Sequence, residues 1–336
     1  MLPHPTHPRA RPLGAAVRPS RPARLRRVVL PVALAAACGR GEPAYRAGDG
    51  TAAPPAAAPS RGGDDDALHA PAGAWYAGGA TCVGRPVFRI RELRPGLFAL
   101  RQPACTHFEK PFLYLLVGRE RALLLDTGAG GIDVVGPIDS LLGAWRAAHG
   151  GAPRTLVVAH THAHDDHVAG DAQFRARPGV TLVAPDPAAV RRHFALDRSG
   201  GGAAPYDLGG RVLDVLAIPG HEPASIAVYD RTTGVLLTGD TFYPGRLYVA
   251  DTAAFAASTA RLVDFTATRP VSAILGTHVE QTRTPYVDYP MGTQDQPAED
   301  RLSLSRAELV SLDSAVRTMR GRFVRRRLPR FTVWPL

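Results

Sequence analysis

The amino-acid sequence predicts an α/β fold in which two β-sheets pack together and helices flank them, an αβ/βα four-layer sandwich. Apolar runs of strand length dominate both halves of the chain, with stretches of helical spacing between them. The 336 residues and the 45% hydrophobic content suit one large domain with a sizeable core and further segments. No internal repeat is visible in the sequence, so the pattern does not favour a solenoid or a propeller.

Glycine and proline residues set the limits of the elements in the first half of the predicted domain. Gly118-Arg119-Glu120 separates two apolar runs and predicts a hairpin, and Gly150-Gly151 ends a stretch of helical spacing. Pro187 suits the first turn of a short helix. The expected elements are strands at 87–90, 97–100, 112–117, 121–125, 155–159 and 180–184, and helices at 134–148, 168–174 and 187–194.

The second half carries closely spaced strands, followed by a helix and a last core strand. A Gly-rich loop at 198–204 precedes them, and an amphipathic helix at 302–319 is expected to pack on the outside. Residues 279–300 form either a lid or a packed connection. The expected elements are strands at 212–218, 226–229, 235–238 and 271–275, and a helix at 253–268.

A heptapeptide directly after the strand at 155–159 carries the strongest chemical signal. Residues 161–167 read T-H-A-H-D-D-H, and imidazole and carboxylate groups are ligands that zinc and similar divalent metals prefer. At a strand end, alternation directs His162 and His164 to one side. As the chain turns, Asp166 and His167 can face a second point, so one cluster can serve two adjacent metals. The alternative is a surface His-rich tract that binds metal by chance.

Three later strand ends each finish in a further candidate ligand. His221, Asp240 and His278 follow the apolar runs at 212–218, 235–237 and 271–275. Three independent strand ends that each terminate in a ligand type argue against a fortuitous cluster.

These residues together resemble the metallo-β-lactamase fold hydrolases, the superfamily that also holds glyoxalase II and metal-dependent lactonases. The motif H-x-H-x-D-H matches residues 162–167, and Leu124-Leu125-Asp126-Thr127-Gly128 resembles the family's early L-x-D-T-G strand end. The similarity runs from about residue 85 to 280 and implies the four-layer sandwich of that family. It implies a first metal held by His162, His164 and His221, a second held by Asp166, His167 and His278, and a bridge through Asp240.

The ligand set implies two divalent metal ions, with zinc expected and manganese or iron as alternatives. Two metals that share Asp240 would also share a water, whose pKa falls toward about 7 and which yields hydroxide at neutral pH. The expected function is an exported, dinuclear metal-dependent hydrolase that cleaves an ester, thioester, lactone or amide bond in a small-molecule substrate. Asp166 and Asp240 are the expected catalytic residues, and Asp126 is expected either to orient a ligand imidazole or to form a strand-terminal turn.

Other classes of the superfamily fit less well. Flavodiiron-type proteins place a Glu where His164 stands, and nucleases need a long insertion where only 37 residues separate Asp240 from His278. One lactamase subclass lacks the bridging Asp, so Asp240 favours glyoxalase-II-like or lactonase-like hydrolases. Lys110 is the only Lys and lies far upstream, so the glutathione-binding Lys of glyoxalase II cannot be placed. The alternatives are a β-lactamase proper and a non-catalytic metal-binding lipoprotein.

Weaker candidates surround the predicted ligands. His160 shares the strand face of His162 and is expected to be structural, whereas Asp165 is expected to be solvated. Tyr243, Arg246 and Tyr248 follow Asp240 closely. Two alternatives are open for these side chains. Either they line the pocket and donate to an oxyanion or to a substrate carboxylate, or they belong to an ordinary loop.

The N-terminal sequence predicts export. Arginine residues precede an apolar run at 28–37, which is too short to span a bilayer and ends at Cys38, as in a secretory signal. The residues before the break, Ala35-Ala36-Ala37-Cys38, resemble a bacterial lipobox, which implies a lipid anchor at Cys38. There are three alternatives: ordinary signal cleavage, a later start of the chain at Val17, and an uncleaved tail in a cytoplasmic protein. The expected location is the periplasm, free or as a membrane-anchored lipoprotein of a bacterium. The expected organisation is a signal peptide at 1–37, a disordered Ala/Pro/Gly-rich linker at 38–73, a hydrolase domain at 74–320 and a basic C-terminal tail at 321–336.

The charge of the chain and its cysteines limit which binding partners and which cellular compartment are expected. The formal charge of +10 is concentrated in residues 1–37, with seven Arg and no acid, and near the C-terminus, so nucleic-acid binding is not expected. Cys82 and Cys105 either pair as a disulfide in an exported chain or remain free thiols. The sequence does not indicate an oligomeric state.

Overall fold

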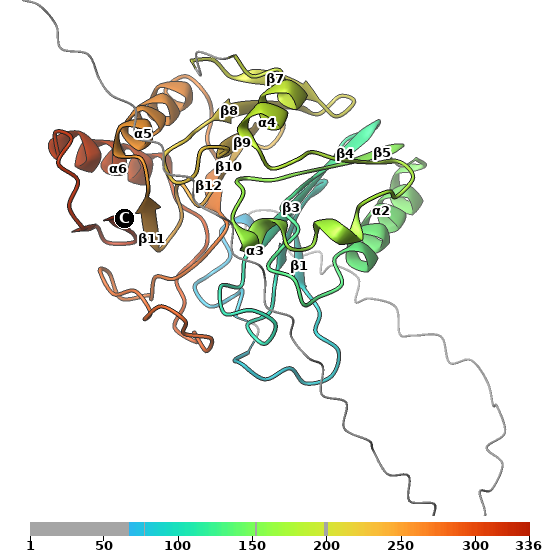
Figure 1. The fold of residues 1–336 in the computed structure, drawn as a ribbon. Helices are drawn as coiled ribbons and strands as arrows, with labels where there is room; N and C mark the ends of the chain where they lie inside the picture. Colours follow the sequence, from blue (N-terminus) through green and yellow to red (C-terminus); the bar gives the residue numbers. More distant parts are fainter. Residues whose placement is uncertain (1–66, 77, 152, 198–200) are drawn as a thin grey trace, which may run out of the picture. The chain divides into compact units, whose positions relative to one another are not determined.

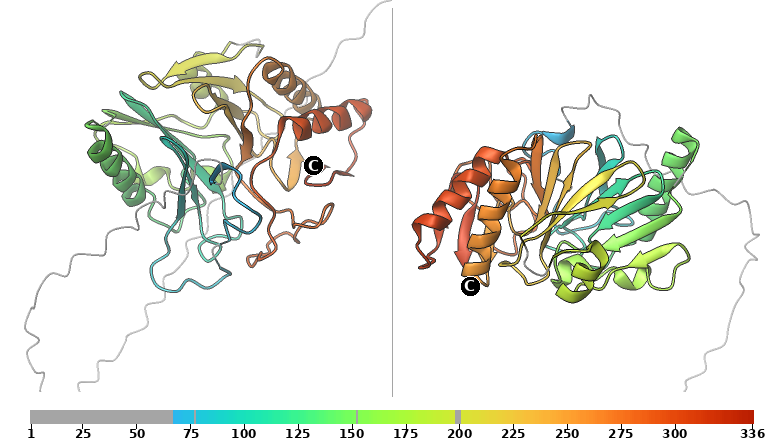
Figure 2. Two further views of the ribbon diagram at one scale, coloured as in Figure 1. Left: turned by 180° about the vertical axis from the view of Figure 1, so that it is seen from behind. Right: turned by 90° about the horizontal axis from the view of Figure 1, so that it is seen from above.

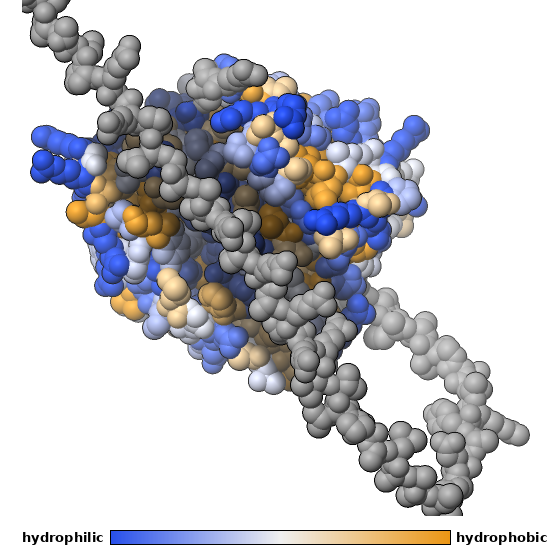
Figure 3. All heavy atoms as spheres, viewed as in Figure 1, coloured by the Kyte–Doolittle hydropathy of each residue, from blue (hydrophilic) through white to orange (hydrophobic). Residues whose placement is uncertain are grey.

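The computed structural model describes residues 67–76, 78–151, 153–197 and 201–336, which belong to one compact unit. The predicted signal peptide, Cys38 and residues 38–66 of the predicted linker lie outside the described residues. Within the described part, no helix is long and apolar enough to cross a membrane. On the face drawn in Figure 3, hydrophilic and hydrophobic side chains are interspersed over this unit.

The first sheet has six strands in sequential order, from β1 to β6. The pairs β1–β2, β2–β3 and β3–β4 are antiparallel, and β4–β5 and β5–β6 are parallel. The strands are β1 (Arg89–Arg94), β2 (Leu97–Arg101), β3 (Phe112–Val117), β4 (Arg121–Leu125), β5 (Thr155–Ala159) and β6 (Val180–Leu182), and the helices of this half are α2 (Val135–His149), α3 (Asp165–Val168) and α4 (Pro187–Phe194).

The second sheet has five strands in the order β12-β10-β9-β8-β7. Only β10 and β12 pair in parallel, because helix α5 connects them by a crossover. The strands are β7 (Ala204–Asp207), β8 (Val212–Ala217), β9 (Ile226–Asp230), β10 (Val235–Gly239) and β12 (Ala273–Gly276), and the helices are α5 (Thr252–Thr266) and α6 (Arg306–Thr318).

Strand alternation divides the apolar side chains into three core layers. In β3, Phe112, Tyr114 and Leu116 join the cluster between the sheets, whereas Leu113, Leu115 and Val117 pack toward α2. In β10, Val235 and Leu237 face the first sheet, and Leu236 joins the cluster that contains side chains of α5 and α6. Figures 1 and 2 show α2 outside one sheet and α5 and α6 outside the other. The predicted four-layer αβ/βα sandwich is confirmed.

The direction of the strands brings the predicted ligands to one end of the molecule. β4 and β5 run in parallel, and β8 and β10 run in the same direction because both pair antiparallel with β9. The segments after β4, β5, β8, β10 and β12 carry Asp126, the 161–167 motif, His221, Asp240 and His278.

Three elements differ from the sequence prediction. The helix predicted at 168–174 is divided into α3 and a 3-10 turn, η1 (Asp171–Gln173), and part of the predicted loop at 198–204 leads directly into β7. A third sheet was not predicted. It consists of β11 (Arg246–Val249), β14 (Thr332–Pro335) and β13 (Arg326–Arg327).

The predicted boundary at residue 320 therefore differs from the structure. β14 pairs in parallel with β11, and Phe331 and Val333 are buried in the cluster that contains Phe242 and Leu247. The segment 321–336 is thus part of the folded unit, because its apolar residues complete the core beside α6. At the other end, Leu68 and Ala70 are buried as well, so the fold includes described residues before 74.

Cys82 and Cys105 form a disulfide, which decides between the two alternatives left by the sequence. The bond links the segment before β1 to the loop between β2 and β3. That loop continues through His107 and Glu109 into the cavity described below.

Candidate metal centre

The motif loop is held in place by Asp126 at the end of β4. One carboxylate oxygen of Asp126 accepts from the Thr161 backbone N–H at 2.7 Å, and the other accepts from the Thr161 hydroxyl at 2.9 Å. Asp126 has a φ of 70°, a left-handed conformation that Asp tolerates better than most residues. Gly239 lies on the opposite side of the loop, where a Cβ would come within 2.7 Å of Thr161 Cβ, so only glycine allows the two sheets to approach this closely.

Three imidazole nitrogens converge on one point. His162 Nε2 lies 3.1 Å from His164 Nδ1, and His221 Nε2 lies 3.2 Å from His162 Nε2 and 3.1 Å from His164 Nδ1. The three contacts cannot all be hydrogen bonds, because each inward nitrogen of a neutral ring is either a donor or an acceptor and at least two of the three must be of the same kind. Their arrangement suits a tetrahedral metal with three protein ligands.

A second group of ligand atoms lies beside the first. Asp166 Oδ2 is 3.0 Å from His167 Nε2 and 3.1 Å from His278 Nε2. These three side chains are buried and offer one carboxylate oxygen and two ring nitrogens to a common point.

Asp240 lies between the two groups and turns one oxygen toward each. Its Oδ2 is 3.8 Å from His162 Nε2 and 3.7 Å from His221 Nε2. Its Oδ1 is 3.7 Å from His167 Nε2 and 3.3 Å from His278 Nε2. The Thr277 hydroxyl donates to the same Oδ1 and restrains the carboxylate.

The remote nitrogens of the candidate ligands have partners that fix each ring. His167 Nδ1 contacts Asp126 Oδ2 at 2.9 Å, which is the orienting contact expected for Asp126. His221 Nδ1 donates to the Tyr248 carbonyl at 2.8 Å, and His278 Nδ1 donates to the Glu109 carbonyl at 3.0 Å. Each ring is therefore positioned with its other nitrogen facing the cluster.

Burial and charge act in opposite directions at this cluster. Burial lowers the pKa of His162 well below its usual value, and the neighbouring His167 adds to the effect. Burial opposes protonation of His167 too, but the carboxylates of Asp166, Asp126 and Asp240 outweigh it and raise its pKa. Burial would raise the pKa of Asp240, yet His278, His167 and His162 lower it well below the usual range.

The donor set fits two divalent metal ions. His167 Nε2 and Asp166 Oδ2 are buried and, although 3.0 Å apart, are not oriented to hydrogen-bond each other or another described residue, which is costly for polar atoms unless another group engages them. Imidazole and carboxylate ligands suit zinc, and the same set accepts manganese or iron. The structure thus brings together all seven residues predicted from the sequence: His162, His164, Asp166, His167, His221, Asp240 and His278.

A cavity of about 500 Å³ opens onto the cluster, and its wall includes both predicted and unpredicted residues. Tyr243 and Tyr248 line it, as one of the two alternatives expected. Arg246 does not line it, because its guanidinium is paired with Glu280 at 2.6 Å and Asp288 at 2.7 Å. Arg246 is therefore not available to hold a substrate carboxylate.

Several residues of the cavity were not found from the sequence. His107, Phe108 and Glu109 come from the loop after Cys105, and Glu280 follows His278. Burial and the neighbouring Asp166 raise the pKa of Glu109 to about 7. None of these residues belongs to a ligand pattern, so no sequence signal distinguished them from an ordinary loop.

The remaining predictions concern His160, Asp165 and the segment 279–300. His160 is buried and contacts Asp171 at 2.8 Å, away from the ligand atoms, as expected for a structural histidine. Asp165 is exposed at the rim of the cavity. Pro290 to Thr293 line a smaller cavity beside Glu109 and Lys110, so the 279–300 segment borders the site.

Comparison with known proteins agrees with this geometry. The model of the Metallo-beta-lactamase superfamily matches residues 110–278, which is half of the chain and includes all seven candidate ligands. The chain belongs to the metallo-beta-lactamase superfamily, which confirms the resemblance inferred from the motif.

The curated relatives are hydrolases by name. A hydroxyacylglutathione hydrolase of Anaeromyxobacter dehalogenans is 35% identical over 132 residues, which cover 39% of this chain and 46% of that protein. The acyl-coenzyme A thioesterase MBLAC2 of Gallus gallus is 27% identical over 194 residues, or 48% of this chain and 68% of that protein. The match thus spans less than half of the hydroxyacylglutathione hydrolase. Among solved structures, a metallo-beta-lactamase from Pontibacter korlensis aligns with 68% of this chain and 99% of its own, at 17% identity and a TM-score of 0.45.

Proposed function

We propose that this protein is a dinuclear metal-dependent hydrolase that cleaves an acyl bond (an ester, thioester, lactone or amide) in a small-molecule substrate. The observation that carries the proposal is the position of Asp240, which turns one oxygen toward each of two ligand groups. A single metal would not need a carboxylate placed between two complete groups of ligands.

Each ion would have its own residues. His162, His164 and His221 would hold the first, and Asp166, His167 and His278 the second, with Asp240 shared. When bound, divalent ions of this kind polarise a carbonyl oxygen and lower the pKa of water, so the chain needs no Ser or Cys nucleophile.

The protein's own side chains would bind and orient the substrate. Tyr248 lines the cavity and its hydroxyl accepts from Arg246 Nε at 3.0 Å, which leaves the Tyr248 O–H free to donate to an oxygen of the substrate. Phe108 and Tyr243 contribute aromatic rings to the cavity wall. The walls are partly apolar and the floor is charged, as in many small-molecule sites.

Thioesters are the first substrates to examine, because two of the relatives are named for thioester chemistry. The metal-loaded protein should be assayed with acyl thioesters, lactones, aryl esters and β-lactams, with and without chelator. We expect chelator-sensitive turnover of at least one acyl substrate and a loss of 100-fold or more in Asp240→Ala. Asp264→Ala removes an exposed carboxylate on α5 and serves as the matched control. A metal-replete protein without turnover on the whole panel would contradict the proposal.

We also propose that the chain is exported and, by its lipobox-like junction, anchored at Cys38. The basic and apolar segments before Cys38 support export, and the Cys82–Cys105 disulfide suits an oxidising compartment. The mature protein produced in a bacterium should begin at Cys38 and fractionate with membranes, and Cys38→Ser should release it or leave it unprocessed. Recovery from the cytoplasm with residues 1–37 attached would show the proposal to be wrong.

A further inference from the structure

A second cavity lies at the other ends of the strands that carry the metal ligands. Arg119 precedes β4 and Arg211 precedes β8, whereas Asp126 and His221 follow those strands. The strands are five and six residues long, so this distal cavity is roughly 15–20 Å from the metal centre at ~3.3 Å per residue. Its volume of about 560 Å³ is comparable to that of known small-molecule sites.

One wall of the distal cavity is a pair of stacked rings at the end of α2. The Trp145 and His149 rings have centroids 3.7 Å apart and an interplanar angle of 19°. His149 Nδ1 contacts the Trp145 carbonyl at 3.0 Å, and the edge of Phe98 supports the indole from the sheet side. This wall offers a flat aromatic face on which a planar ligand can stack.

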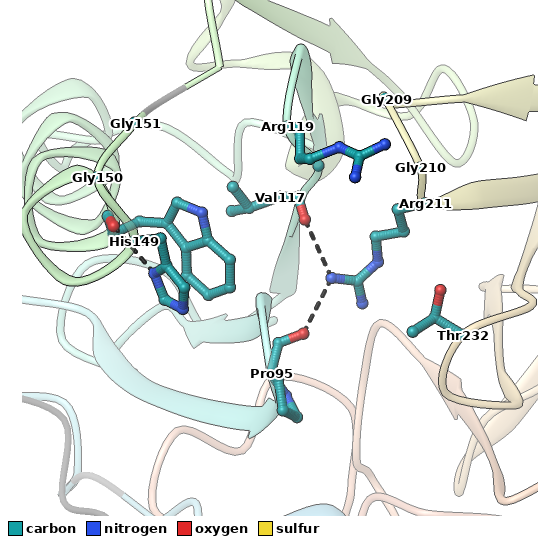
Figure 4. A pocket seen from close by; sticks show the side chains of 12 residues that line it. Pro95, Val117, Arg119, His149, Gly150, Gly151, Gly209, Gly210, Arg211 and Thr232 are labelled. Carbon is teal, nitrogen blue, oxygen red and sulfur yellow. Dashed lines mark hydrogen bonds between the residues drawn. The ribbon is translucent and has the colours of Figure 1, made fainter.

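Glycines keep the rest of the distal cavity open. Gly209 and Gly210 form the turn before β8, with φ values of 91° and 81°. A Cβ on Gly210 would lie 2.7 Å from a terminal guanidinium nitrogen of Arg119, so Arg119 packs directly against this turn. Gly150 and Gly151 leave the side near His149 without side chains (Figure 4).

Arg119 supplies a positive charge to the distal cavity. No Asp or Glu is among the described residues that line it. Arg119 is exposed, and no ion pair joins its guanidinium to another residue in the described ranges. Figure 4 shows Arg119 above the cavity, with His149 on one side and Arg211 and Thr232 on the other.

Arg211 belongs to the same wall, and its guanidinium is held by protein partners. Its Nη1 donates to the carbonyls of Pro95 and Val117, and its Nη2 pairs with Asp230 at 2.6 Å. The residue is only 6% exposed, yet its Nε–H has no partner among the described residues. Because this N–H is buried and Asp230 offsets the charge of the guanidinium, Arg211 shapes the wall, and Arg119 is the cation that remains available to a ligand.

We propose that the distal cavity binds a planar aromatic anion, whose ring stacks on the outer face of the Trp145–His149 pair and whose carboxylate or phosphate lies against Arg119. Aromatic carboxylates and nucleotides share this chemistry. The site is independent of the hydrolase activity proposed above, because the two cavities have no lining residue in common.

Equilibrium titration of the metal-loaded protein tests the proposal with four probes. The probes are 1-naphthoate, AMP, cyclohexanecarboxylate, which lacks the aromatic ring, and 1-naphthalenemethanol, which lacks the charge. We expect 1-naphthoate, AMP or both to bind at least tenfold more tightly than the last two. Tighter binding of AMP would identify a nucleotide site, and tighter binding of 1-naphthoate would identify an aromatic-acid site.

Two pairs of variants locate the binding. Arg119→Gln should weaken binding at least tenfold, whereas Arg322→Gln, an exposed Arg elsewhere, should not. Gly151→Phe should block the cavity and Gly143→Phe, on α2 outside it, should not; a Cβ meets nothing within 4 Å at either position. No binding of either aromatic anion up to millimolar concentration, equal binding of cyclohexanecarboxylate, or binding unaffected by both Arg119→Gln and Gly151→Phe would overturn the proposal.

Discussion

Asp126 shows how a residue without a ligand role can organise the candidate site. It is fully buried and its carboxylate contacts both Thr161, at the start of the motif, and the remote nitrogen of His167. The L-x-D-T-G pattern indicated an orienting role or a turn, and the structure assigns both, since the residue also adopts a positive φ.

Asp126→Asn is expected to weaken metal binding while the fold is retained. Asn tolerates the same left-handed conformation, but a neutral amide supports the His167 ring less strongly than a carboxylate does. Substitutions of such orienting partners typically cost about 10–100-fold in metal affinity. Competition with a chromophoric chelator should show this loss in Asp126→Asn and not in Asp139→Asn, which alters an exposed carboxylate on α2. Unchanged affinity would mean that Asp126 acts on the loop alone.

The seven candidate ligands could be predicted because each follows an apolar strand, and parallel strands bring their ends together. Glu109 could not be predicted. It reaches the cluster from a long loop whose path depends on the Cys82–Cys105 disulfide and on packing against 290–293, and neither is a local property of the sequence.

At the scale of elements, long and strongly apolar strands were predictable, and the short strands of the third sheet were not. β3, β5 and β10 are buried over every or nearly every residue and appear where expected. β13 has two exposed arginines, and β11 begins with Arg246, whose guanidinium is neutralised by Glu280 and Asp288 from a distant segment. Strand pairing at such places is decided by tertiary contacts rather than by residue preference.

The Cys82–Cys105 disulfide is expected to stabilise the loop that leads to Glu109. The bond closes 23 residues, for which the chain-entropy treatment gives about 3 kcal/mol. Urea unfolding of the double variant Cys82→Ser/Cys105→Ser should show a loss of this order. A reductant should lower the midpoint of the wild-type protein and leave that of the double variant unchanged. A midpoint insensitive to reductant in both proteins would show that the bond does not contribute.

At the scale of the whole molecule, the candidate ligands come from both sheets. His162 and His164 follow β5 of the first sheet, and His221 and Asp240 follow β8 and β10 of the second. The second group combines Asp166 and His167 with His278 in the same way. The sheets otherwise meet through apolar packing, so a bound metal would add a link between them at one end of the sandwich.

Metal removal is therefore expected to lower the stability of the entire fold and not only of the site. A ligand that binds only the folded state stabilises it by RT ln(1 + [L]/Kd), about 4 kcal/mol at a thousandfold excess over Kd. Differential scanning calorimetry with and without chelator should show a lower Tm without metal, and elemental analysis of the loaded protein should show about two ions per chain.

His221→Ala removes one ligand of the first group, so its chelator-dependent shift in Tm should be smaller than that of the wild-type protein. His69→Ala, which alters an exposed His, should keep the full shift. The free energy of metal binding must appear in the unfolding of the domain that supplies the ligands. If the wild-type Tm does not respond to chelation, the ions therefore do not link the sheets.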